Sequence, residues 1–327
     1  MLLKIAKSNQ PFTLVLIIII GLIIWYNPLL KYQSLYEVPT ASMPLYSVLQ
    51  TILQSHIIIS KLLGFILFIG ISFYLNHLNT KYIFISERTY LPSIIYVIIV
   101  SLPIYNKNLY PALPATLFFL IAIERLFDSY KDEKLSYNVF DAGLLIGIAS
   151  LFYFSILFFV IFFWAVLLMI RKFYWREWLY VLMGAAVPYI FLFSFYYLTD
   201  RNNEVIFHAI KDNFIVHNRI FLSKIQLIAG CYIIILLLLS SQYIIRIFPS
   251  KKIFARKSFN LFLIAFLLSL LIYFLIPCVS IELIFIGSIP FSFLISHFFI
   301  RPRKSKWIEL IFDLLIIILI LTQVIKL

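Results

Sequence analysis

The sequence predicts an all-α protein, a polytopic bundle of transmembrane helices, and three observations indicate it. Of the 327 residues, 63% are apolar and 13% are charged, against about 45–50% and 25% in an ordinary soluble domain. The apolar runs are continuous rather than alternating, which favours helices over the strands of a membrane barrel. Since about 20 apolar residues cross the hydrocarbon layer, the chain has room for about eleven spans and little else. We therefore expect a single integral membrane domain over residues 1–327.

The first apolar run, from Phe12 to Leu30, follows Lys4 and Lys7 and has the layout of a signal peptide. It is longer than the apolar core of a signal peptide, which has about 7–15 residues. The small residues Thr40 to Ser42 lie too far downstream for a cleavage site. We therefore expect the run to remain as the first span.

The apolar segments predict eleven spans, which we place at 12–30, 57–75, 90–104, 110–127, 139–153, 154–170, 178–199, 225–245, 258–276, 279–300 and 307–325. The fifth and sixth share a run of 29 uncharged residues from Ala142 to Ile170, about 43 Å long as one helix. Gly143 and Gly147 in the fifth span are typical of positions where two helices pack closely.

Loop charges decide between one span and two, because cytoplasmic loops are enriched in Lys and Arg. With a cytoplasmic N-terminus and two spans, 19 Lys and Arg residues lie inside and seven outside. A single span gives 12 inside and 14 outside. We therefore expect eleven spans, with the N-terminus in the cytoplasm and the C-terminus outside. The net charge of +13 then reflects loops that contact anionic headgroups, and not nucleic acid.

Two outside segments have enough polarity to form a site, Lys31 to His56 and Asp200 to Lys224. In the second, apolar residues recur every three to four positions, which predicts an amphipathic helix near Glu204 to His217 that lies in the membrane interface. These apolar residues are Val205, Ile206, Ile210, Phe214 and Phe221.

The usual motifs of soluble enzymes are absent. The chain has no GxGxxG, GxxxxGK[ST], HExxH or GxSxG sequence, so nucleotide-binding, zinc-hydrolase and serine-hydrolase chemistry have no motif to support them. Cys231 and Cys278 lie within or beside apolar runs and are expected to pack there, not to form a disulfide or bind metal. Candidate residues are therefore sought among polar groups at membrane depth.

Glu37 is the only acidic residue of the first outside loop, where Pro39 stiffens the chain. Its carboxylate at headgroup level has the chemistry of a general base, or of a ligand for a divalent metal ion beside a phosphate. Lys61 lies about one turn into the second span, where it either snorkels to the interface or binds a lipid phosphate. We expect His56 and Glu282 within reach, with Glu282 as a charge partner of Lys61 or as a second carboxylate.

The charges at the predicted cytoplasmic ends of the spans indicate structural ion pairs rather than a functional site. Arg88 and Glu124 lie at the same depth and are expected to form an ion pair between the third and fourth spans. Glu309 and Asp313 lie four residues apart in the last span and are expected to pair with the basic residues before it.

The order of these parts resembles the N-terminal half of the GT-C class of membrane glycosyltransferases, over about residues 12–200. The matching parts are the first span, the loop with Glu37, the Met43–Tyr46 entry to the next helix, and the short glycine-containing helix with Gly143 and Gly147. The resemblance implies that Glu37 takes part in catalysis and that the donor is a polyprenyl-phosphate-linked sugar on the non-cytoplasmic side. Many members of the class have an acid in the next outside loop, and this chain has none there.

The segment Glu87 to Pro92 also resembles an uncharacterised family of multispanning inner-membrane proteins of Bacteroidota. That resemblance implies a bacterial inner membrane and no particular function. Three hypotheses stay open: a glycosyltransferase of envelope glycan or lipid metabolism, a non-catalytic subunit or scaffold of an envelope-assembly complex, and a lipid or solute transporter. Membrane lipids are the expected partners in each case.

Overall fold

The computed structural model describes residues 2–7, 11–30, 42–85, 87–102, 109–129, 135–170, 174–200, 204–215, 224–247, 253–276, 279, 281–300 and 306–324. Within these ranges the ordered elements are helices, and no strand occurs. The predicted all-α class is therefore confirmed.

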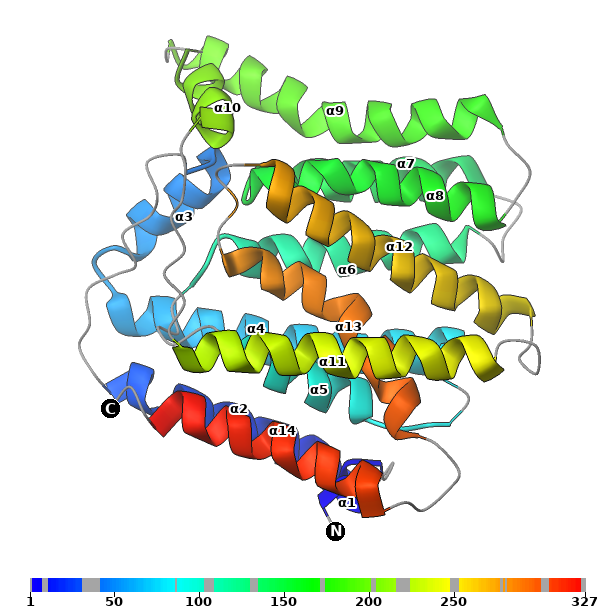
Figure 1. The fold of residues 1–327 in the computed structure, drawn as a ribbon. Coiled ribbons are helices and arrows are strands. Elements are labelled where there is room, and N and C mark those ends of the chain that lie inside the picture. Colours follow the sequence, from blue (N-terminus) through cyan, green and yellow to red (C-terminus); the bar gives the residue numbers. More distant parts are fainter. Residues whose placement is uncertain are drawn as a thin grey trace.

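The helices lie where the sequence places its apolar segments, and they form a layered bundle (Figure 1). In chain order they are α1 (Leu2–Lys7), α2 (Pro11–Leu30), α3 (Pro44–Leu53), α4 (Ile57–Tyr82), α5 (Leu91–Ser101), α6 (Ala112–Asp128), α7 (Leu135–Ser150), the 3₁₀-helix η1 (Phe154–Phe159), α8 (Val160–Ile170), α9 (Trp175–Leu198), α10 (Glu204–Ile215), α11 (Lys224–Ile247), α12 (Ile253–Leu275), the 3₁₀-helix η3 (Ile281–Leu283), α13 (Ile284–Phe299) and α14 (Lys306–Val324).

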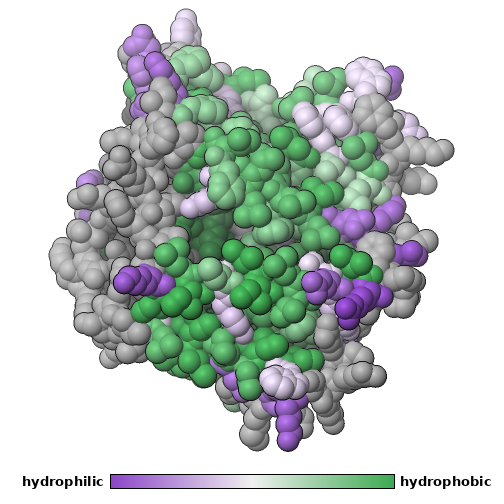
Figure 2. Space-filling view, in the orientation of Figure 1, coloured by the Kyte–Doolittle hydropathy of each residue, from purple (hydrophilic) through white to green (hydrophobic). Residues whose placement is uncertain are grey.

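Five helical segments of the described chain are long and apolar enough to cross a membrane. They are α4, α9, most of α11, most of α12, and η3 together with α13. The structure therefore agrees with a multi-pass membrane protein. Much of the surface drawn in Figure 2 is apolar, as expected of a protein whose sides face lipid.

The long uncharged run 142–170 is divided between α7 and the η1–α8 segment, as the loop charges predict. α7 ends at Ser150, and η1 begins at Phe154 after a turn. The Ser150 hydroxyl donates to the Gly147 carbonyl oxygen at 2.7 Å, and the Leu45 backbone N–H donates to the Leu151 carbonyl oxygen at 3.2 Å. The start of α3 thus provides a hydrogen-bond donor for the Leu151 carbonyl oxygen, which has no partner within α7 because the helix ends there.

Small residues bring α7 and α9 into backbone contact. A Cβ atom added at Gly143 would lie 2.3 Å from the Val181 carbonyl oxygen, and one at Gly147 would lie 2.5 Å from that of Ala185. A Cβ atom at Gly184 of α9 would lie 2.3 Å from a carbonyl oxygen of α7. The prediction that Gly143 and Gly147 are close-packing positions is confirmed.

The centre of the bundle is formed by α5 and α13, which pack against each other. Every side chain of α5 is buried, and so is nearly every side chain of α13. Aromatic rings join α13 to its neighbours: Phe293 stacks on Phe262 of α12 with ring centroids 4.6 Å apart, and Phe84 meets both rings edge-on. Close packing of this kind holds helices together where lipid removes the hydrophobic driving force.

The helices α3 and α10 run across the others at one end of the bundle (Figure 1). The amphipathic segment predicted near Glu204 to His217 is a helix over Glu204–Ile215, while His217 lies outside the described residues. Ile206 is fully buried, and the Phe214 ring lies 5.4 Å from that of Phe154 at the start of η1. α10 therefore packs over the turn between α7 and η1 with part of its predicted apolar face, while Val205 and Phe214 are exposed.

Candidate functional site

The candidate residues that the structure describes lie at the end of the bundle that carries α3 and α10. Glu37 falls outside the described residues. His56 is exposed directly before α4, and Lys61 in the first turns of α4 is only 3% exposed. Glu282 in η3 is 2% exposed. α4 and α13 both begin at this end of the bundle (Figure 1), and Lys61 and Glu282 are both buried.

The burial of Lys61 is unusual for a lysine near the end of an apolar helix. A snorkelling lysine keeps its ammonium group in the interface and remains accessible there. Lys61 instead lies among protein atoms. A charged group inside the membrane part of a protein is costly and is therefore a candidate for function.

Two tyrosines accompany Glu282. The Tyr46 hydroxyl of α3 donates a hydrogen bond of 2.6 Å to the Leu109 carbonyl oxygen, and the next residue, Tyr110, packs its ring against Phe285 of α13. Burial raises the pKa of Tyr46, and the carboxylate of Glu282 raises it further. Tyr110 also lies within electrostatic reach of Glu282 and of Tyr46. We call these three residues the Tyr46–Glu282 cluster.

This cluster joins three segments that are far apart in the sequence. α3 supplies one hydroxyl, the chain before α6 supplies the second, and η3 supplies the carboxylate. Sequence reasoning named Glu282 and missed both tyrosines as site residues. One feature of the sequence could have indicated the two tyrosines, because each has a proline close by. Pro44 opens α3 two residues before Tyr46, and Pro111 follows Tyr110. Prolines at these positions fix where each helix begins.

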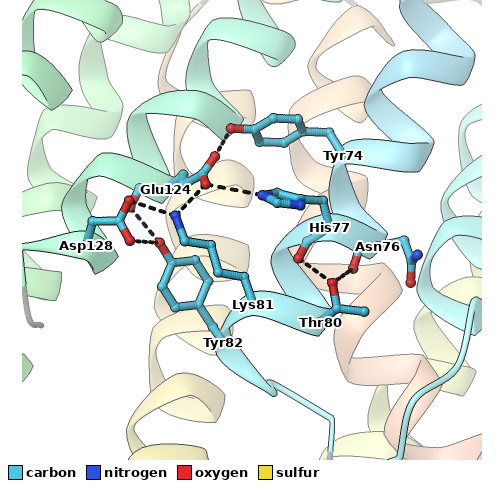
Figure 3. A network of polar contacts seen from close by, with 8 residues as sticks. All are labelled: Tyr74, Asn76, His77, Thr80, Lys81, Tyr82, Glu124 and Asp128. Atoms are coloured by element: carbon cyan, nitrogen blue, oxygen red, sulfur yellow. Dashed lines mark hydrogen bonds and ion pairs between the residues drawn. The ribbon is translucent and has the colours of Figure 1, made fainter.

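A second polar group lies between α4 and α6 (Figure 3). The Lys81 ammonium lies 2.6 Å from Glu124 Oε1 and 2.8 Å from Asp128 Oδ2. The Tyr74 hydroxyl donates to Glu124, and the Tyr82 hydroxyl donates to Asp128 at 2.7 Å. We call this group, with His77 at 3.3 Å from Glu124, the Lys81 network.

The predicted pair of Arg88 with Glu124 is wrong, because Arg88 is exposed and Glu124 is bonded to α4. A common depth expected from the sequence does not fix the direction in which a side chain points. Lys81 faces α6 because it follows Tyr74 by seven residues on one face of α4, while Glu124 and Asp128 are four apart on one face of α6. The network therefore fastens two helices together and is architectural.

Replacing Lys81 by methionine is expected to destabilise the protein by about 1–3 kcal/mol, because two carboxylates then face each other without a cation. The triple variant that adds Glu124→Gln and Asp128→Asn removes both negative charges and is expected to recover most of the loss. Arg88→Met, at an exposed arginine of the same end, is the matched control. Thermal unfolding in detergent measures all three. A melting temperature that falls equally in Lys81→Met and Arg88→Met would contradict the assignment.

A metal site is not formed by the part of the chain that the structure describes, where no three His, Cys, Asp or Glu residues are grouped to hold an ion. Comparison of the chain with protein-family models, curated proteins and solved structures finds no match. Of the two polar groups described above, the Tyr46–Glu282 cluster is the candidate site, since its carboxylate is buried at the same end as Lys61.

Proposed function

We propose that this protein is a glycosyltransferase of the bacterial inner membrane that takes a sugar from a polyprenyl-phosphate-linked donor. In this proposal eleven helices cross the membrane and the N-terminus is cytoplasmic, so that α3, α10 and the Tyr46–Glu282 cluster face outside. The observation that carries the proposal is the burial of a cation, Lys61, and an acid, Glu282, at that end of the bundle. A lipid phosphate with a sugar attached needs charged and hydrogen-bonding groups at this depth.

The chemistry assigns each group a role. An acceptor hydroxyl gives its proton to a base while its oxygen attacks the anomeric carbon, and the bond from that carbon to the phosphate oxygen breaks. Glu37 is the base in this proposal, and Lys61 stabilises the negative charge of the departing polyprenyl phosphate. Glu282 and the two tyrosine hydroxyls have the chemistry to bind sugar hydroxyls.

The arrangement of α11, α12 and α13 supports access for a lipid from the side. α13 packs against both α11 and α12, and Figure 2 shows a recess in the apolar surface over this region, toward the end that carries α3 and α10. A polyprenyl chain in this recess stays in an apolar environment while its phosphate reaches the polar end. α10 lies across that end, as expected of a helix in the interface.

Replacing Lys61 by methionine is expected to weaken binding of a polyprenyl phosphate about 10- to 100-fold, since a hydrogen bond to a charged group contributes about 1.5–3 kcal/mol. Lys224→Met is the matched control, because Lys224 is an exposed lysine at the start of α11. Titration of radiolabelled polyprenyl phosphate into protein held in nanodiscs measures the affinity. Equal affinities of the two variants would contradict the role of Lys61.

A further inference from the structure

An apolar groove lies between the first and last long helices, away from the Tyr46–Glu282 cluster. It has a volume of about 340 Å³, which is at the lower end of the range for small-molecule sites. It is lined by apolar side chains from α1, α2, α5 and α14. Its walls include Ala6, Leu16, Ile20, Ile24, Ile94 and Ile316.

The groove has the depth of one leaflet. On α2 its lining runs from Leu16 to Ile24, and on α14 from Phe312 to Ile320. Eight residues of helix rise about 12 Å, and half of the hydrocarbon layer is about 15 Å. A single acyl chain that enters from one face of the membrane fits this length.

Basic residues stand at one end of the groove. Lys7 follows the lining residue Ala6 in α1 and is partly buried, and Lys306 opens α14, which packs against α1. Burial lowers the pKa of Lys7, and Glu87 partly offsets this effect. By sequence, Lys4 in α1 and Arg301, Arg303 and Lys304 in the segment before α14 are further basic residues, against the acids Glu87 and Glu309. This excess of basic residues in the sequence matches an anionic headgroup.

We propose that this groove is a binding site for an anionic phospholipid, with one acyl chain between α2, α5 and α14 and the phosphate beside Lys7 and Lys306. A lipid bound there would fill the gap between α2 and α14, and would so connect the N-terminal and C-terminal helices. The site is independent of the sugar-transfer proposal, since no residue of the Tyr46–Glu282 cluster lines it.

Native mass spectrometry of the delipidated protein, titrated with phosphatidylglycerol or phosphatidylcholine of the same chain composition, tests the site. The first phosphatidylglycerol is expected to bind more tightly than the first phosphatidylcholine. Lys7→Gln is expected to reduce this preference about fivefold, since a basic residue near the membrane surface contributes about that factor. Ile20→Trp fills the groove and is expected to remove the site, while Ile19→Trp, on the exposed face of α2, keeps it.

A second variant in the opposite wall, Ile316→Phe, serves if Ile20→Trp does not fold. Three results would overturn the proposal. The first is equal affinity for the two lipids, and the second is retention of phosphatidylglycerol by both groove variants. The third is a wild-type dimer that Ile20→Trp converts to a monomer, because a second copy would then occupy the groove.

Discussion

Replacing Gly143 by alanine is expected to destabilise the protein by about 3 kcal/mol, the upper end of the usual range for overpacking. The added methyl group would lie 2.3 Å from the Val181 carbonyl oxygen and 2.9 Å from its Cα atom. These are backbone atoms of α9, so the contact is relieved only if the two helices separate. Separation would also remove the Gly147 and Gly184 contacts, which share the same interface.

Gly70→Ala is the matched control for this prediction, because a Cβ atom at Gly70 of α4 meets nothing within 4 Å. Alanine is favoured over glycine in a helix by about 1 kcal/mol, so this variant is expected to be as stable as the wild type or slightly more so. Thermal unfolding in detergent, followed by the loss of the monodisperse peak, compares the two. Equal melting temperatures would show that the α7–α9 contact is not tight in solution.

The Gly143→Ala substitution is also expected to affect the proposed site. α7 ends at the turn whose Leu151 carbonyl oxygen is bonded to the start of α3, and α3 carries Tyr46. Displacement of α7 therefore moves the segment that supplies one hydroxyl of the Tyr46–Glu282 cluster. Loss of ligand binding in Gly143→Ala would accompany the loss of stability and would not by itself indicate a binding role for the glycine.

The sequence predicts the helices of this protein well, because hydropathy over 15–20 residues is a strong signal in a membrane protein. It also predicts the break between α7 and η1, since counting charges across alternate loops compares two complete topologies. It predicts contacts between helices poorly. Lys81 is the partner of Glu124 because of the direction in which it points from α4, and a sequence gives depth without relative rotation.

The candidate site is predicted in part for a similar reason. Lys61 and Glu282 stand out in the sequence as charges in apolar surroundings, and both are buried at one end. Tyr46 and Tyr110 do not stand out, since the chain has 21 tyrosines and their approach to Glu282 depends on tertiary structure. Glu37, the residue to which the resemblance gives the catalytic role, lies outside the described residues.

Glu37→Gln is expected to lower sugar transfer by about 10²- to 10⁴-fold, which is the usual contribution of a general base. Glutamine keeps the size of the side chain and removes the charge that accepts the proton, so expression and stability are expected to be unchanged. Glu204→Gln is the matched control, because Glu204 is an exposed acid in the first turn of α10 at the same end of the bundle.

Sugar transfer is measured most directly by the release of polyprenyl phosphate. The protein is placed in liposomes with a panel of polyprenyl-phosphate-linked sugars, and acceptor glycans are added outside. The proposal predicts transfer by the wild type and by Glu204→Gln, and none above background by Glu37→Gln. Full transfer by Glu37→Gln, or no transfer by the wild type from any donor of the panel, would contradict the proposal and leave a scaffold of an envelope-assembly complex as the better account.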